Sequence, residues 1–166
     1  MIFLDMDGVL ADFDKALELR GIENLTHFIH KPFDEWTDEE RALDVKVREH
    51  MEREDFWPHI PIKPGAHELI AASATRRPTF ILTATPRNSP TRERIGRQKI
   101  AWARDILHFP VHRIIVCERH EKKNFANVGR ILVDDMAANC EEWATYNGTP
   151  IHYTDLDKTL EVIKQL

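Results

Sequence analysis

Residues 1–9 read MIFLDMDGV, in which a short apolar run is followed by two aspartates and a glycine. The run Ile2-Phe3-Leu4 does not alternate with polar residues, which is typical of a strand buried on both faces. Asp5 and Asp7 come directly after it, and side chains two positions apart on an extended chain emerge on the same side. Because like charges this close repel each other, we expect a cation between them. Oxygen ligands of this kind favour Mg²⁺ over zinc.

Similar apolar runs recur along the chain, each three to five residues long and rich in Ile, Val and Phe. They span residues 79–82, 113–117, 131–133 and 150–153. Helical patterns separate them, at about 66–74, from Ser89-Pro90 through Ile106, over 137–146 and from Leu156 onward. Ser89 is a good N-cap, with proline at the first helical position. Strands that alternate with helices predict an α/β fold, a Rossmann-like, doubly wound parallel sheet.

One segment interrupts this alternation. About seventy residues separate the first two strands, which is far more than a simple crossover needs. Residues 15–59 have a helical pattern without a strand, so we predict a small helical cap inserted after the first strand. Residues 1–14 and 60–166 would then form the α/β core domain.

Polar residues follow each predicted strand. Besides the first pair, they include Thr83 and Thr85, the adjacent lysines Lys122 and Lys123, and the pair Asp134-Asp135. In a parallel sheet of this kind, ligands bind outside the carboxyl ends of the strands. Carboxylates, hydroxyls and a lysine are therefore expected to meet at one edge of the sheet, which favours a catalytic site over turn and capping residues.

These motifs, in this order, resemble the four motifs of the haloacid dehalogenase-like (HAD) phosphatases: Asp5-Met6-Asp7-Gly8-Val9, Thr83, Lys122 and Asp134-Asp135. The predicted insertion also falls where that family carries its cap. More narrowly, residues 5–13 (DMDGVLADF) together with Phe56-Trp57 and residues 64–66 are similar to the 5'(3')-deoxyribonucleotidase branch and its phage and bacterial relatives. That narrower resemblance rests on fewer residues.

The resemblance implies a role for each motif. Asp5 would be the nucleophile that forms an aspartyl-phosphate, and Asp7 the general acid and then base. Thr83 would hydrogen-bond a phosphoryl oxygen. Lys122 would neutralise charge on the nucleophile and phosphate, as suits a compact cation. Mg²⁺ would be held by the first and fourth motifs, with Asp5, Asp7, Asp134 and Asp135 as the candidate ligands.

Several assignments stay open at this point. Only one of the adjacent lysines can face the site, and we favour Lys122 over Lys123 because Glu121-Lys122 resembles the acidic-lysine pair of relatives. Asp135 is favoured as the metal ligand, with Asp134 orienting a metal-bound water or the lysine. Thr85 would be a second phosphate contact or a turn residue.

The substrate is predicted from the aromatic residues at both ends of the insertion. Phe13 and Trp57 would line a slot for a nucleobase between cap and core, or else belong to the core of the cap. The sequence thus favours a phosphomonoesterase for (deoxy)nucleoside monophosphates. A phosphatase for another small phosphate and a phosphoacceptor or nucleotide-binding module without turnover are the alternatives. Asp7 argues against the last, since a mere phosphoacceptor needs no acid–base partner.

Composition narrows the class of partner. The 166 residues carry a net charge of -5 with 42% hydrophobic and 31% charged residues, which predicts a folded domain without a general basic surface. We expect a small phosphorylated substrate, with no duplex nucleic acid and no membrane as partner. The two cysteines are expected to be buried thiols in a reducing compartment, and the charge at Asp5 comes too early for a signal peptide, so a cytoplasmic location is predicted.

Overall fold

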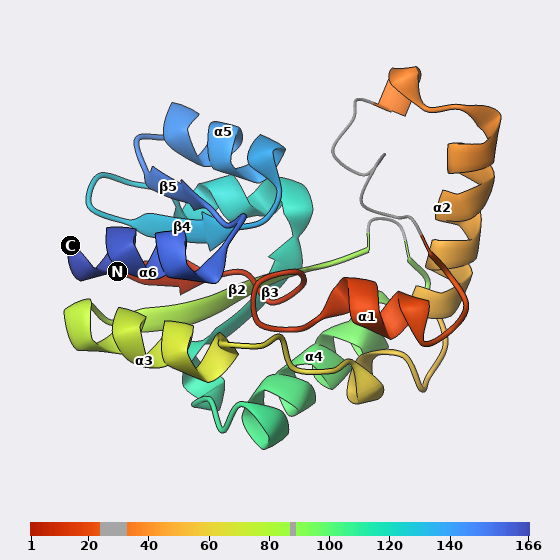
Figure 1. The fold of residues 1–166 in the computed structure, drawn as a ribbon, viewed down its shortest axis with the longest axis horizontal. Coiled ribbons are helices and arrows are strands. Elements are labelled where there is room, and N and C mark those ends of the chain that lie inside the picture. Colours follow the sequence, from red (N-terminus) through yellow and green to blue (C-terminus); the bar gives the residue numbers. More distant parts are fainter. Residues whose placement is uncertain (24–32, 87–88) are drawn as a thin grey trace.

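A five-stranded, all-parallel sheet forms the centre of the molecule in the computed structural model, which describes residues 1–23, 33–86 and 89–166 (Figure 1). The strand order is β3-β2-β1-β4-β5. The strands are β1 (Ile2–Leu4), β2 (Thr79–Thr85), β3 (Ile114–Glu118), β4 (Ile131–Asp134) and β5 (Thr149–His152). The predicted α/β fold with a doubly wound parallel sheet is therefore confirmed, and β1 lies in its middle.

Side chains on successive strand positions enter two different hydrophobic cores. Ile2 and Leu4 belong to the larger core and Phe3 to the smaller one on the opposite face. This period of two follows from the pleat of the strand, and it explains why the buried strands read as unbroken apolar runs. The edge strands β3 and β5 are less buried, because neighbours cover only one of their sides.

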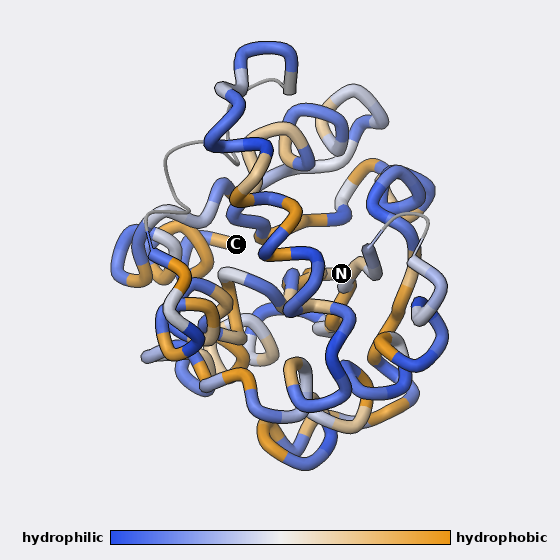
Figure 2. Tube along the Cα trace, turned by 90° about the vertical axis from the view of Figure 1, so that its right-hand side faces the viewer, coloured by the Kyte–Doolittle hydropathy of each residue, from blue (hydrophilic) through white to orange (hydrophobic). Residues whose placement is uncertain are grey.

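Helices cover both faces of the sheet. The larger core contains buried residues of α1 (Phe13–Glu18), α3 (Ala66–Arg76), α4 (Arg92–Ile106) and α6 (Leu156–Lys164). The smaller core is closed by Trp143 of α5 (Ala137–Thr145) and by Phe125 at the end of the 3-10 helix η5 (Arg119–Phe125). Hydrophobic and hydrophilic residues alternate along the helices (Figure 2). This pattern is expected for a helix with one buried face and one face toward solvent. Among the described residues no helix has both the length and the apolar character needed to traverse a membrane.

Helix α4 begins later than the sequence predicts. Its N-cap is Thr91 rather than Ser89, so the predicted cap at Ser89-Pro90 is wrong. The Ser89 hydroxyl accepts a hydrogen bond from the Thr91 backbone N–H at 3.1 Å. This bond closes a turn ahead of the helix, and the hydroxyl is used there instead of on the first helical turn.

The segment predicted as a cap contains α2 (Asp38–Met51) and the 3-10 helices η2 (Phe33–Glu35) and η3 (Trp57–His59); its residues 24–32 lie outside the described part. Helix α2 starts with a capping box between Thr37 and Glu40. It stands at one end of the molecule, away from α5 and β5 (Figure 1). Val47 of α2 and the buried Trp57 join the larger core, so this segment packs against the domain that carries the sheet. The boundaries 15–59 stay a prediction.

Candidate active site

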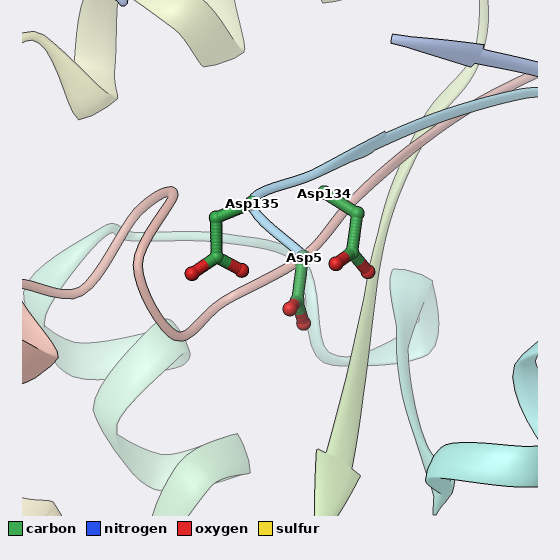
Figure 3. Close-up of side chains that lie close together, drawn as sticks. All are labelled: Asp5, Asp134 and Asp135. Carbon is green, nitrogen blue, oxygen red and sulfur yellow. The ribbon is translucent and has the colours of Figure 1, made fainter. Parts of the chain in front are cut away.

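Three carboxylates meet at the carboxyl ends of the two central strands. Asp5 follows β1, and Asp134 and Asp135 end and follow β4, which pairs with β1 in register. One oxygen from each of the three lies within 4.8 Å of the others, and all three side chains turn toward one region (Figure 3). The sequence motifs of the first and fourth strands are thus brought together as expected for neighbouring parallel strands.

Lys122 lies between two of these carboxylates. Its Nζ is 2.9 Å from Asp5 Oδ1 and donates a hydrogen bond of 2.7 Å to Asp134 Oδ2. Burial alone would lower the pKa of Lys122, but the two carboxylates more than offset this and hold it well above its usual value. The ammonium is therefore a fixed positive charge beside the carboxylate of Asp5.

The adjacent Lys123 points elsewhere, although both lysines sit in η5. Its Nζ forms an ion pair with Glu142 of α5 at 3.0 Å, so its charge is balanced there. Of the two candidates, the structure brings only Lys122 to the carboxylates.

Asp134 and Asp135 occupy different environments. Asp134 Oδ1 accepts hydrogen bonds from the Met136 backbone N–H at 2.9 Å and from Asn139 at 2.8 Å, while Oδ2 accepts from Lys122. Both oxygens of Asp134 are therefore engaged by the protein. Asp135 has no such donors among the described residues, which leaves its carboxylate available to a ligand.

The pKa values of the carboxyls show that negative charge is crowded here. Burial raises the pKa of Asp5 to about 7; Lys122 opposes the rise, and Asp134 and Asp7 add to it. Burial, followed by repulsion from Asp5 and Asp134, raises the pKa of Asp135 to about 8. A hard divalent cation would relieve this repulsion, and an all-oxygen donor set suits Mg²⁺. The residues therefore fit the predicted metal, and Asp5 and Asp135 are the side chains that could hold it.

Asp7 does not join this group through its side chain. Its Oδ2 forms an ion pair of 2.5 Å with Lys99, a residue of α4 that is fully buried. The same ammonium donates to Thr83 Oγ1 at 3.1 Å and to the Ala84 carbonyl at 2.6 Å. The structure thus joins Asp7 and Thr83 through a lysine that the sequence reasoning missed.

The signal for Lys99 was present in the helical pattern. Lys99 lies four residues after Ile95 and three before Trp102, so it falls on the buried stripe of α4. A lysine at such a position requires a partner, because an unpaired buried charge is costly. Reading α4 for the charge on its apolar face would have identified it.

The aromatic residues predicted as a base slot pack mainly against each other. Trp57 is fully buried, its indole N–H donates to the Met51 carbonyl at 2.9 Å, and its ring lies 4.1 Å from Lys99 Nζ. Phe13 is half-buried and lies 5.6 Å from Phe56 and 6.1 Å from Trp57, centroid to centroid. Trp57 therefore presents no free ring face here, and we do not retain it as a substrate contact. Phe13 keeps part of its surface exposed.

Thr85 is the last residue of β2. It borders a hollow of about 180 Å³ between the ends of β2 and β3 and the first turns of α4, where Arg92, Glu93, Glu118 and Glu121 supply the charged lining. Thr83, in contrast, is fully buried against Lys99. The two threonines predicted on this strand thus face different surroundings.

The chain resembles solved structures at low sequence identity. No protein-family model and no curated protein matches the chain. A hydrolase from Pseudomonas syringae aligns over 98% of this chain and 89% of its own, with 17% identity and a TM-score of 0.47. A HAD hydrolase of family IA, variant 3, from Entamoeba histolytica aligns over 98% of each chain, with 16% identity and a TM-score of 0.48.

Proposed function

We propose that this protein is a Mg²⁺-dependent phosphomonoesterase of the HAD type that works through an aspartyl-phosphate on Asp5. The observation that carries the proposal is Lys122, whose buried ammonium bridges Asp5 and Asp134 beside the unengaged carboxylate of Asp135. A carboxylate nucleophile that attacks an anionic phosphate needs such a charge close by.

The side chains supply a two-step reaction. Asp5 attacks phosphorus while the bond to the leaving oxygen breaks, and Asp7 gives that oxygen a proton, so that an alcohol departs. Water then attacks the aspartyl-phosphate, Asp7 takes a proton from it, and the bond between phosphorus and Asp5 breaks to release inorganic phosphate. Asp5 is oriented for this task, because its Oδ1 accepts a hydrogen bond from the Met6 backbone N–H at 2.8 Å and forms an ion pair with Lys122 at 2.9 Å.

Asp5 and Asp135 would hold the cation in this proposal. When bound, Mg²⁺ would neutralise charge shared between the nucleophile and the phosphoryl oxygens. Lys122 keeps its own contacts to Asp5 and Asp134, and these contacts orient Asp5. Asp134, saturated by three donors, would position Lys122 rather than bind the metal.

Small monophosphates are the proposed substrates, with (deoxy)nucleoside monophosphates as the finer proposal. The partly exposed ring of Phe13 begins α1, a few residues after Asp5, and is backed by Phe56 and Trp57. A base that stacked on this ring would gain about 1–3 kcal/mol. The narrower sequence resemblance supports the deoxy forms.

A screen of phosphorylated metabolites with purified protein and Mg²⁺ tests the proposal directly. We expect release of inorganic phosphate from at least one small monophosphate, and none from a parallel sample of the Asp5→Asn variant. A protein that became phosphorylated but released no phosphate would be a phosphoacceptor module instead. Activity that survived in Asp5→Asn would show that another residue is the nucleophile.

A further inference from the structure

Lys99 is an unusual residue within this site, because its charge is sealed from solvent while its partner is not. The Lys99 side chain is 0% exposed and that of Asp7 is 28% exposed. The ammonium has three protons, and three oxygens accept from it: Asp7 Oδ2, Thr83 Oγ1 and the Ala84 carbonyl. All of its hydrogen-bonding capacity is used within the protein.

The surroundings of Lys99 hold it in place. The Trp57 ring lies 4.1 Å from Nζ, and the Trp57 indole is itself fixed to the Met51 carbonyl. Trp102, one turn further along α4, donates from its indole to the Ile60 carbonyl at 2.9 Å. These contacts fasten α4 to the segment that returns from the insertion. Lys99 is thus packed against a ring that is itself held in place.

The bonds from Lys99 decide which atoms of its partners remain available. A threonine hydroxyl has one proton, and because Oγ1 of Thr83 accepts from Lys99, that proton is free to be donated elsewhere. Asp7 Oδ2 is held by Lys99, whereas the buried Oδ1 has no hydrogen-bond partner among the described residues. A buried carboxylate oxygen without a partner costs free energy, so Oδ1 is the atom of Asp7 with unmet capacity for a reacting proton.

We propose that Lys99 is a positioning residue for the reaction: it fixes Asp7 through Oδ2 and Thr83 through Oγ1, so that Oδ1 and the hydroxyl proton serve the substrate. The inference rests on the proposed phosphatase function and adds a residue to it. Since its side chain has no exposed surface, Lys99 acts through Asp7 and Thr83 and does not itself touch the substrate.

The test compares Lys99→Met, which keeps most of the volume but loses the donors, with Arg97→Met. Arg97 lies on the exposed face of the same helix, where it pairs with Glu93. For an alkyl monophosphate we expect kcat of Lys99→Met to fall about 100-fold with little change in KM, because misplacement of an acid–base group costs about this much. Arg97→Met should keep the wild-type values.

The leaving group separates a positioning role from a merely structural one. p-Nitrophenolate departs without a proton, so the burst of p-nitrophenyl phosphate cleavage should slow less than about tenfold in Lys99→Met. A structural defect would lower the burst rate and the alkyl phosphate rate equally, and that result would overturn the inference. An active wild type with an unchanged Lys99→Met variant would overturn it as well, whereas an inactive wild type would overturn the proposed function together with it.

If Lys99→Met does not fold, a crystal structure of the wild type with Mg²⁺ and beryllium trifluoride, a mimic of the aspartyl-phosphate, decides the question. We expect Lys99 Nζ to stay within hydrogen-bond distance of Asp7 and Thr83. An Nζ that leaves Asp7 and binds a fluoride of the mimic would make Lys99 a phosphate ligand and contradict the assignment.

Discussion

Gly8 and Asp135 approach so closely that no side chain fits between them: a β carbon on Gly8 would lie 2.2 Å from Asp135 Oδ2. Gly8 also has a φ of 75°, in the left-handed region. The loop that follows Asp5 therefore packs directly against the carboxylate of Asp135, which follows the neighbouring strand β4. Glycine is required at position 8 for two reasons: the left-handed backbone conformation disfavours other residues, and the Asp135 carboxylate leaves no room for a β carbon.

Gly8→Ala should consequently lose activity as well as stability. The matched control is Gly129→Ala, because Gly129 has a φ of 77° but nothing within 4 Å of a built β carbon. The left-handed conformation alone costs about 1–2 kcal/mol, which both variants should lose in chemical denaturation. Only Gly8→Ala should also lose phosphatase activity, by more than about tenfold, through displacement of Asp135. Equal activity in the two variants would contradict the role given to this contact.

Asp5→Asn should abolish turnover and leave the fold intact. The substitution removes the nucleophile with almost no change in volume, so we expect a loss of several powers of ten in kcat. Circular dichroism and thermal unfolding at pH 8 provide the control. Because a buried carboxylate is removed, the variant should be at least as stable as the wild type at that pH. A folded variant with more than about a tenth of wild-type turnover would disprove the assignment of Asp5.

The crowded carboxyls predict that stability falls with pH in the metal-free protein. In the folded state the pKa of Asp5 is about 7 and that of Asp135 about 8, against an unfolded value of about 3.9. Between these values the folded state binds more protons than the unfolded state. The stabilisation that these additional protons give the folded state is fully present below the unfolded pKa. It is lost as the pH rises through the folded pKa values of Asp5 and Asp135. Thermal unfolding with chelator should therefore show a falling Tm between about pH 5 and pH 8.

Two controls attribute this trend to the site. Saturating Mg²⁺ should flatten the fall, because a cation that binds the ionised carboxylates of the folded state stabilises it. Asp135→Asn should flatten it in part even without metal. An identical slope in wild type and in Asp135→Asn would show that other groups cause the pH dependence.

Turnover should depend on Mg²⁺ and stop when a chelator is added. Ca²⁺ should bind yet support little activity, since its larger and looser coordination places nucleophile and phosphorus less accurately. Phosphate release with each cation, together with a binding titration for Ca²⁺, measures both effects. Full activity in excess chelator, or strong activation by zinc alone, would contradict the oxygen-ligand site.

Phe13→Ala tests the substrate preference. We expect kcat/KM for deoxynucleoside monophosphates to exceed that for hexose phosphates, and the variant to lose most of this difference as stacking is removed. Phe80→Ala is the control, since Phe80 is also partly buried but packs in the smaller core with Phe3. If hexose phosphates are preferred, or if both variants behave alike, the base slot is wrong while the phosphatase proposal stands.

The sheet and the acidic centre were readable from the sequence because both depend on local patterns. Buried parallel strands leave unbroken apolar runs, and the residues just after them share an edge, as Asp5 and Asp135 do. The start of α4 was missed because Ser89 closes a turn instead of capping the helix. The helical pattern of α4 predicts that Lys99 is buried, but it cannot predict the partners of Lys99, because Asp7 lies 92 residues away and only the folded chain brings it and the Trp57 ring together.

The order of the strands has a consequence for how this protein is made on the ribosome. Strand β1 emerges first, yet both of its hydrogen-bonding neighbours, β2 and β4, come later in the chain. The edge that pairs with β4 stays open until β4 has left the exit tunnel, after β2 has emerged, and non-local pairing of this kind is slow. A nascent chain arrested before β4 would expose a hydrophobic edge to other chains. Release of such truncated chains should therefore produce aggregates rather than a smaller folded unit.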